Sequence, residues 1–237
     1  MLSVIIPTLN EGQALAEVLR HVAGNLGVVP HEIIVCDGGS RDDTCAVARQ
    51  YGAQVVRTER PSRAAQLNLG AQQAAGELLY FLHADTLPPP RFGVIINQYH
   101  AQGYQAGCFR LRFDYRHWIL RLSGWASRFN AHNFQFGDQS LFMNAAAFRQ
   151  LGGFNEELLL MEDVDIVGRI KHLHRFVVMP YEVLTSARKY REYGVSRTEL
   201  THLAVFTLYS LHVKQPTLAH WYRKLLHNRR NSTRKAA

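Results

Sequence analysis

Apolar residues in the first third of the chain alternate between short continuous runs and longer segments with helical spacing. The short runs predict strands at residues 2–6, 32–36, 54–57 and 78–82. Between the first two runs, apolar residues recur at helical spacing from Leu15 to Leu26, which predicts a helix over residues 13–26. Further helices are expected over residues 43–51 and 63–75. Strands and helices that alternate in this way are typical of a parallel sheet with helices on both faces.

The pattern is less regular after the three prolines at positions 88–90. Strands are expected at residues 108–113, 141–144 and 176–179, and helices at 92–101, at 118–129 and from about 161 onward. A loop is expected over residues 131–137, and Pro216 is expected to separate two final helices. We therefore predict one mixed α/β domain over residues 1–190, followed by a helical, basic extension over residues 191–237.

Composition narrows the class of protein. The chain has 237 residues, of which 47% are hydrophobic, and this content excludes wholesale disorder. Three cysteines without a CxxC pair do not suit a disulfide framework or a thiolate zinc site, which favours a reducing cytoplasm. The first residues lack the basic region of a secretory signal, and the apolar stretch at 200–213 is too short and too polar to span a membrane.

Positive charge is concentrated at the end of the chain. Residues 188–237 hold 11 Lys and Arg and 2 Asp and Glu, a formal charge of +9, whereas residues 1–187 carry −1. Because aromatic and aliphatic residues lie among these basic ones, the final helices have an amphipathic pattern, and such helices can lie on an anionic membrane surface. The alternative is that these helices pack on the domain and leave a basic tail. Nucleic acid is not expected as a partner, because no nucleic-acid motif accompanies the charge.

Three polar loops follow predicted strands, at residues 7–11, 37–44 and 83–86. In open parallel sheets, ligands bind beyond the carboxyl ends of the strands, where the loops meet the N-termini of the following helices. We therefore expect the three loops to converge on one cleft.

These loops carry the strings P-T-L-N-E, V-C-D-G-G-S-R-D-D-T and G-E-L-L-Y-F-L-H-A-D-T, and G-D-Q and E-D follow at residues 137–139 and 162–163. In this order and strand context, the chain resembles the family 2 glycosyltransferases over roughly residues 2–170, and in particular small bacterial members with F-L-H-A-D-T. The resemblance implies a GT-A fold: a Rossmann-like, mostly parallel sheet flanked by helices, which binds a nucleotide-sugar.

The resemblance implies roles for five residues in nucleotide binding. Pro7, Thr8 and Glu11 match the turn around the nucleotide, and Asp37 matches the carboxylate that accepts a hydrogen bond from uracil or guanine. Arg63 matches the basic residue that reaches the base or the phosphates. The alternatives are a turn-capping role for Asp37 and a solvated helix N-terminus for Arg63.

The family's metal-binding D-x-D motif reads His83-Ala84-Asp85 here. Asp85 is therefore the expected protein ligand of Mn²⁺ or Mg²⁺. Phosphate oxygens and water molecules can supply the remaining ligands of the octahedral ion. His83 is a second ligand, a sugar contact or a packed histidine. As a ligand it would favour Mn²⁺.

Glu162-Asp163 resembles the family's E-D motif, which implies that Asp163 is the general base that deprotonates the acceptor hydroxyl. A single base without a carboxylate nucleophile implies inversion at the anomeric carbon. Asp165 is a rival base. The alternative is structural: Glu162, Asp163 and Asp165 only stabilise the N-terminus of a helix, where negative charge is favoured. With His83 and Glu162, residues Asp138 and Gln139 are expected to contact the sugar or the acceptor.

Processive members of the family carry Q-x-x-R-W, but residues 186–190 read S-A-R-K-Y. Because the Gln is missing and no spanning helix is expected, a processive synthase is not expected. Arg188, Lys189 and Arg191 either contact the diphosphate or form a solvated basic face.

The sequence as a whole predicts a metal-dependent, inverting glycosyltransferase that moves a sugar from a UDP- or GDP-linked donor to an acceptor hydroxyl. The acceptor is left open, and a lipid-linked acceptor would suit a cytoplasmic enzyme bound to the inner face of the membrane. One rival is a sugar-phosphate nucleotidyltransferase, although the G-x-G-x-R loop expected after its first strand is absent. The other is a scaffold that binds nucleotide-sugar without turnover.

Overall fold

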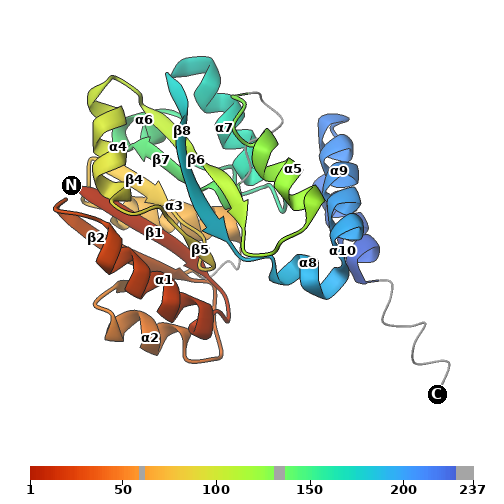
Figure 1. Ribbon diagram of the computed structural model, residues 1–237, viewed down its shortest axis with the longest axis horizontal. Coiled ribbons are helices and arrows are strands. Elements are labelled where there is room, and N and C mark those ends of the chain that lie inside the picture. The colour runs from red at the N-terminus through yellow and green to blue at the C-terminus, as the bar shows by residue number, and fades with distance from the viewer. Residues whose placement is uncertain (59–61, 131–136, 228–237) are drawn as a thin grey trace.

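The computed structural model describes residues 1–58, 62–130 and 137–227, and within these the chain folds around one eight-stranded sheet (Figure 1). The strands are β1 (Leu2–Thr8), β2 (His31–Asp37), β3 (Gln54–Arg57), β4 (Leu78–Phe81), β5 (Thr86–Leu87), β6 (Ala106–Phe113), β7 (Leu141–Asn144) and β8 (Phe176–Thr185). The α-helices are α1 (Gly12–Asn25), α2 (Thr44–Gln50), α3 (Arg63–Gln73), α4 (Phe92–Ala101), α5 (Trp118–Ala126), α6 (Ala145–Gln150), α7 (Glu162–Leu173), α8 (Arg188–Tyr193), α9 (Val195–Ser210) and α10 (Gln215–His227), and a 3-10 turn, η1, spans Gly137–Gln139.

The sheet is parallel in its N-terminal half and mixed beyond it. Its order is β3-β2-β1-β4-β7-β6-β8-β5, with β1, β2, β3 and β4 parallel to one another. Strand β7 is antiparallel to both β4 and β6, and β5 is antiparallel to β8. The direction of β7 was not readable from its sequence, because a short apolar run that is buried on both faces carries no alternation.

Strand β8 is longer than the predicted strand at residues 176–179. In its pairing with β6, Phe109 lies opposite Met179 and Arg110 opposite Glu182, so Pro180 and Tyr181 form a bulge. Proline has no N–H to donate to the ladder and is tolerated in a sheet at such a bulge. The proline therefore looks like a strand end in the sequence although the strand continues to Thr185.

Strand β5 and helices α6 and α8 were not predicted, since each is a short element of two to six residues. The break between the final helices occurs at residues 211–214, and Pro216 is the second residue of α10 rather than the break itself. A proline in the first helical turn costs little, because the N–H groups of that turn have no partner within the helix.

Alternate side chains of the central strands feed two hydrophobic clusters on opposite faces of the sheet. On β1, Val4 and Ile6 pack in one cluster, with Leu15 and Val18 of α1. The intervening Ile5 packs in the other, which includes residues of α3 and α7. The two faces hold the sheet rigid, so the loops at its edge have a firm base.

Helices α8, α9 and α10 lie together at one end of the sheet domain, beside α5 (Figure 1). The buried apolar residues of this group include Val205 of α9 and Leu218 and Leu226 of α10. The boundary expected between residues 190 and 191 falls within α8, and the division into two domains stays a prediction. Across the described residues, no helix is both long and apolar enough to cross a bilayer.

Gly70 of α3 tests how tightly the helix packs on the sheet. A Cβ atom there would lie 2.5 Å from Ile5 Cγ2 and 2.6 Å from Cys36 Sγ. We expect Gly70→Ala to lower the free energy of unfolding by about 1–3 kcal/mol, because the added methyl overpacks the core. Urea denaturation measures the difference.

Gly24→Ala on α1 is the matched control. A Cβ atom at Gly24 meets nothing within 4 Å, so this change should be neutral or should stabilise by about 0.5–1 kcal/mol through helix propensity. Equal effects of the two variants would contradict the packing argument.

Candidate functional site

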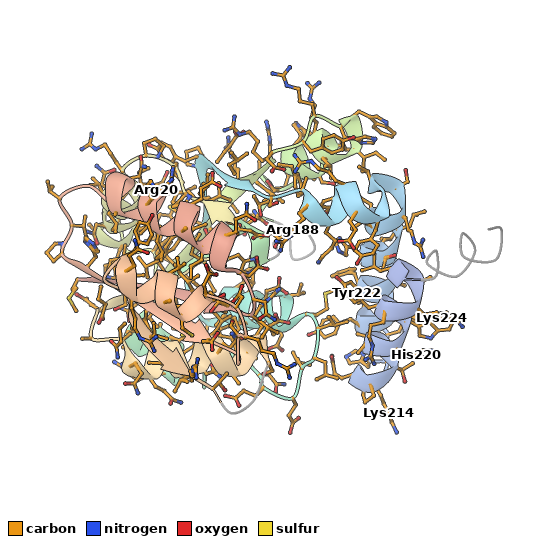
Figure 2. The ribbon with its side chains drawn as sticks, turned by 90° about the horizontal axis from the view of Figure 1, so that it is seen from below. Arg20, Arg188, Lys214, His220, Tyr222 and Lys224 are labelled. Carbon is orange, nitrogen blue, oxygen red and sulfur yellow. The ribbon has the colours of Figure 1, made fainter. Side chains whose placement is uncertain are left out.

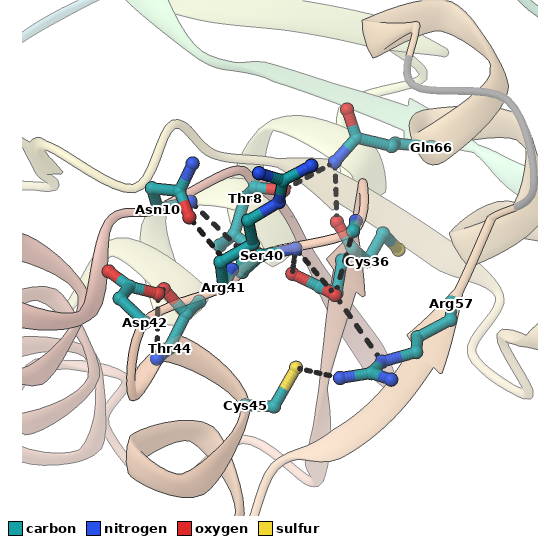
Figure 3. Close-up of polar contacts among 12 residues, drawn as sticks. Thr8, Asn10, Cys36, Ser40, Arg41, Asp42, Thr44, Cys45, Arg57 and Gln66 are labelled. Atoms are coloured by element: carbon teal, nitrogen blue, oxygen red, sulfur yellow. Dashed lines mark hydrogen bonds and ion pairs between the residues drawn. The ribbon is translucent and has the colours of Figure 1, made fainter.

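The loops after β1 and β2 are joined by hydrogen bonds at one edge of the sheet (Figure 3). The Gly38 N–H donates to the Thr8 carbonyl over 2.9 Å. The Asn10 N–H donates to Ser40 Oγ, and Asn10 Oδ1 accepts from the Arg41 N–H, each over 2.9 Å. The expected convergence of these two loops is therefore present.

Asp37 ends β2 and is fully buried. Its carboxylate accepts hydrogen bonds from the backbone N–H groups of Gly39 and Ser40 at 3.1–3.2 Å. Burial alone would raise the pKa of Asp37, but the hydrogen bonds from Ser40 and Gly39 hold that pKa below its usual value. Asp37 is therefore an ionised acceptor that is held in place by the loop.

Arg57 pairs with Asp37, and sequence reasoning missed it. Its Nε lies 3.4 Å from Asp37 Oδ2 (Figure 3). The two residues are opposite each other in the parallel register of β2 and β3. The sequence predicts where β2 and β3 lie but not how their residues align, so the pairing of Arg57 with Asp37 could not be predicted from it.

Gln66 of α3 holds the ends of β1 and β2 together, and it was also missed. Its Nε2 donates to the Thr8 carbonyl over 2.8 Å and to the Cys36 carbonyl over 2.7 Å (Figure 3). The side chain of Thr8 is buried too, and its hydroxyl has no hydrogen-bond partner among the described residues. A buried hydroxyl without a partner suits a ligand that completes its hydrogen bonding.

A second part of the site is a pocket that unites four of the predicted residues: Arg63, His83, Glu162 and Asp163. Its remaining lining is largely apolar and comes from Leu67, Phe81, Cys108, Ser140, Leu141, Phe154 and Val167. Arg63 begins α3, and Ser62 caps this helix by accepting from the Ala65 N–H over 3.1 Å. Helix α7 begins with Glu162 and Asp163. The starts of two helices therefore bring opposite charges to one place.

Glu162 is buried, and its Oε1 lies 3.5 Å from Arg63 Nη1. Burial and the neighbouring charge of Asp163 raise the pKa of Glu162, and Arg63 opposes this shift. The rival base Asp165 is turned to another partner, since its Oδ2 accepts from Arg169 Nη2 over 2.7 Å. The geometry thus separates Asp163, which lines the pocket, from Asp165, which is engaged in a surface ion pair.

Asp138 follows the start of η1 and accepts a hydrogen bond from His83, whose Nδ1 lies 3.0 Å from Asp138 Oδ1. Burial opposes ionisation, but the hydrogen bond and charge of His83, together with Arg63, hold the pKa of Asp138 well below its usual value. The Asp138 side chain is 45% exposed. The neighbouring Gln139 is buried, and its Nε2 donates to the Phe109 carbonyl over 2.9 Å and the Ser127 carbonyl over 3.2 Å.

Asp85 lies in the loop after β4, half-buried among other charges. Burial raises the pKa of Asp85, His83 and Arg188 lower it, and Asp138 and Glu11 raise it further. A divalent cation beside Asp85 would offset this accumulation of negative charge. Within the part of the chain that the structure describes, no three acidic, His or Cys side chains are grouped as a complete ligand set. Asp85 therefore fits an ion that shares its coordination with phosphates and water.

Arg188 of α8 reaches the same edge of the sheet from the other end of the chain. Its Nη1 and Nη2 lie 3.2 Å and 2.8 Å from the two carboxylate oxygens of Glu11. Figure 2 shows Arg188 and Tyr222 on facing sides of the space between the sheet domain and α10. Its two basic neighbours are engaged elsewhere: Lys189 donates to the Tyr222 hydroxyl, and Arg191 pairs with Asp114. Of the three, Arg188 is the one placed beside Glu11 and Asp85.

The family is shown by a match to the description "Glycosyl transferase family 2" over residues 3–151. The chain belongs to this family. Among curated relatives, it is 32% identical over 93 residues to glycosyltransferase AglE of Haloferax volcanii, which is 36% of this chain and 31% of the relative. It is 31% identical over 97 residues to an undecaprenyl-phosphate 4-deoxy-4-formamido-L-arabinose transferase of Pseudomonas savastanoi, 37% of this chain and 29% of that protein. The chain thus matches about a third of these relatives' length.

Solved structures show the same GT-A fold at low sequence identity. A mannosyltransferase from Pyrobaculum calidifontis, in complex with GDP-Man and Mn²⁺, is similar with a TM-score of 0.70 and 20% identity over 94% of this chain and 69% of that one. Glucosyl-3-phosphoglycerate synthase from Mycobacterium tuberculosis, in complex with Mn²⁺, UDP and its product, has a TM-score of 0.59 and 19% identity over 86% and 78%. The predicted fold class is confirmed, with helices at the C-terminus, although the sheet is mixed.

Gln66 supplies a test of how the nucleotide side of the site is built. Gln66→Leu keeps a side chain of similar size but removes both hydrogen bonds to the Thr8 and Cys36 carbonyls. We expect the free energy of unfolding to fall by about 1–3 kcal/mol, the usual cost of leaving a buried polar group unpaired. Gln72→Leu, at an exposed position of the same helix, should change it by less than about 0.5 kcal/mol. Similar losses in both variants would show that Gln66 does not hold these strand ends.

Proposed function

We propose that this chain is a metal-dependent, inverting glycosyltransferase that transfers a sugar from a UDP- or GDP-linked donor to an acceptor hydroxyl. The observation that carries the proposal is that α3 links the two parts of the site: its Gln66 holds the strand ends beside the buried Asp37, and its Arg63 lines the pocket with His83, Glu162 and Asp163. A nucleotide side and an acid-base side adjoin there, which is what sugar transfer from a nucleotide requires.

The nucleoside is bound by the loops after β1 and β2. Asp37 can only accept hydrogen bonds, which suits the N–H edge of uracil or guanine. The Thr8 hydroxyl, which has no partner within the described residues, is available to the nucleotide, and Pro7 and Glu11 complete the same turn. Arg63 pairs with Glu162, whereas the basic partner of Asp37 is Arg57, so we assign Arg63 to the phosphates and sugar rather than the base.

The metal, Mn²⁺ or Mg²⁺, is assigned to Asp85, with His83 beside it. When bound, such an ion offsets the charge that develops on the departing diphosphate. Arg63 and Arg188 would also stabilise the negative charge of the diphosphate, because the positive charges of both side chains act at Asp85. The donor phosphates would thus be held between acidic and basic groups of the protein.

Asp163 is assigned as the general base. Its Oδ1 accepts from the Val164 N–H over 2.8 Å, which orients the carboxylate at the start of α7. As the acceptor oxygen attacks the anomeric carbon, Asp163 takes its proton and the diphosphate leaves on the opposite side, so the configuration inverts. Arg63, whose Nη1 lies 3.5 Å from Glu162 Oε1, offsets the negative charge beside Asp163. Asp138, partly exposed and held by His83, is assigned to sugar or acceptor hydroxyls, and the neighbouring Gln139 is fixed by its hydrogen bonds to the Phe109 and Ser127 carbonyls.

The two rival functions are less well supported. A nucleotidyltransferase would need the G-x-G-x-R loop after β1, where P-T-L-N-E stands, and the family match does not favour it. A scaffold without turnover would not need Asp163 to line the pocket. A lipid-linked acceptor is supported by the name of one relative, an undecaprenyl-phosphate transferase. A cytoplasmic location is supported by three free, buried cysteines.

Donor binding can be tested without knowledge of the acceptor. We expect UDP or GDP at about 100 times its dissociation constant to stabilise the wild type by roughly 2.7 kcal/mol, a rise of several degrees in the unfolding midpoint, and only with Mn²⁺ present. Asp85→Ala should abolish the metal-dependent part of this shift. Glu17→Ala, which removes an exposed carboxylate of α1, should retain it.

Two results would count against this part of the proposal. If Asp85→Ala keeps the full shift, the metal is held elsewhere. If neither nucleotide stabilises the wild type, the site does not bind a UDP- or GDP-linked donor. Both the transferase and the scaffold hypotheses would then be rejected for these two nucleotides.

Asp163→Asn separates catalysis from binding. The amide keeps the shape of the side chain but cannot take a proton, so we expect unchanged donor binding and a loss of turnover of about 10²–10⁴-fold. Turnover is measured as release of the nucleoside diphosphate from the bound donor, with a bacterial lipid extract as the source of acceptor. Asp165→Asn should retain turnover, because Asp165 is paired with Arg169. Wild-type turnover in Asp163→Asn would reject this base.

A further inference from the structure

Helix α5 exposes large apolar side chains along one face. Trp118 is 70% exposed, Leu122 55%, Trp125 48%, and Phe129, just beyond the helix, 43%. Their spacing of four, three and four residues places them in one stripe of the helix. Scattered single apolar residues on a surface need no explanation, but a continuous stripe with two tryptophans indicates an interaction surface.

The opposite side of α5 is fastened to the sheet, so this stripe is held facing outward. Leu120 is buried, and the Leu111 N–H donates to Ser127 Oγ over 2.8 Å. A Cβ atom at Gly124 would lie 2.6 Å from the Leu111 carbonyl oxygen, so the helix backbone rests directly on β6. Rotation of the helix to bury the tryptophans would break these contacts.

Basic side chains border the stripe. Arg121 and Arg128 are exposed, and with Arg112, Trp125 and Glu182 they line a groove of about 360 Å³ between α5 and strands β6 and β8. The Arg128 guanidinium lies 5.6 Å from the centre of the Trp125 ring. Helix α5 itself contains no acidic residue. The surface therefore combines apolar and aromatic side chains with positive charge.

This combination favours a lipid surface over a second copy of the chain. In a symmetric dimer through α5, Arg121 and Arg128 of the two copies would approach each other without acidic residues on the helix to pair with them, and like charges repel. At an anionic bilayer the same arginines meet lipid phosphates, while tryptophan rings are stable at the boundary between headgroups and acyl chains.

We propose that α5 docks this protein on the surface of an anionic lipid bilayer, with Trp118, Leu122 and Trp125 inserted and Arg121 and Arg128 against the headgroups. Helix α9 lies beside α5, because its Glu199 accepts a hydrogen bond from Ser123 of α5 over 3.3 Å, and Leu200 and Leu203 of α9 are exposed as well.

The C-terminal helix α10 is a weaker candidate for the same contact. Its Leu218 and Leu226 are buried, so much of its apolar face is used inside the protein. Figure 2 shows His220 and Lys224 on the side of α10 away from the sheet domain, and Lys214 at the end where the helix begins. Lys214 and Lys224 can attract an anionic surface, but Trp221, 39% exposed, is the one tryptophan there that could insert.

The three tryptophans of the chain allow a test that locates the contact. Trp118 and Trp125 lie on α5 and Trp221 lies on α10. In Trp221→Phe, all tryptophan fluorescence therefore comes from α5. In the double variant Trp118→Phe with Trp125→Phe, it comes from α10. Full-length protein is mixed with vesicles of phosphatidylcholine, or of phosphatidylcholine with phosphatidylglycerol, that carry brominated acyl chains. We expect a blue shift and quenching in Trp221→Phe with the anionic vesicles, and neither in the double variant.

Charge reversal tests the arginines. In co-sedimentation with the anionic vesicles, Arg121→Glu with Arg128→Glu should weaken binding by about tenfold or more. Arg223→Glu with Lys224→Glu makes the same change of charge on α10 and should weaken it less. Unchanged thermal midpoints confirm that the variants are folded.

Three results would overturn the proposal. In the first, the wild type does not sediment with anionic vesicles. In the second, quenching is confined to Trp221, which would assign the contact to the extension. In the third, sedimentation equilibrium would find a dimer that Trp118→Ser with Trp125→Ser converts to a monomer, and a second copy would then be the partner of α5. All readouts are of binding, so they do not depend on the proposed sugar transfer.

Discussion

The parallel pairing of β1 with β2 and β4 is the constraint on which the site depends. In this register Thr8 lies opposite Asp37, and Ile5 lies opposite Phe81, two residues before His83. Because the carboxyl ends of parallel strands meet at one edge, three loops that are far apart in the sequence come together there. A slip of one residue would turn Asp37 to the other face of the sheet. Gln66 works against such a slip, because its amide contacts the carbonyls of both β1 and β2.

The parallel half of the fold and the three loops could be predicted because their signals are local. Each strand is a short apolar run, each helix has its own spacing, and each loop carries a recognisable string. The mixed half could not be predicted in the same way. Residues 141–143 form a short apolar run, so nothing in them gives the direction of β7, and Pro180 hides the continuity of β8 by sitting in a bulge.

The residues of the site that were missed share a different property. Arg57 acts through the register of β2 and β3, and Gln66 through the packing of α3 on the sheet. Arg188 was a candidate from the sequence, but its ion pair with Glu11, across 177 positions of sequence, was not predicted. None of these partners follows from residue type or local spacing. Conversely, Asp165 and Gln139 carry suitable chemical groups, but the structure engages them with Arg169 and with backbone carbonyls. Residues with chemically suitable side chains are common in any sequence. Their neighbours in the folded structure decide which of them are free to act on a ligand.

Charge is divided in the molecule in a way that suits two different contacts. The acids Asp85, Asp138, Glu162 and Asp163 gather around the pocket, where a few cations, Arg63 among them, offset them. The excess positive charge lies outside, on the border of α5 and on the C-terminal helices. Gln139 connects the two regions, because its amide donates to the Ser127 carbonyl just after α5 while Asp138 beside it faces His83. A surface drawn to α5 by its arginines would therefore lie next to the acceptor side of the pocket, while the nucleotide side stays with the loops at the end of β1 and β2.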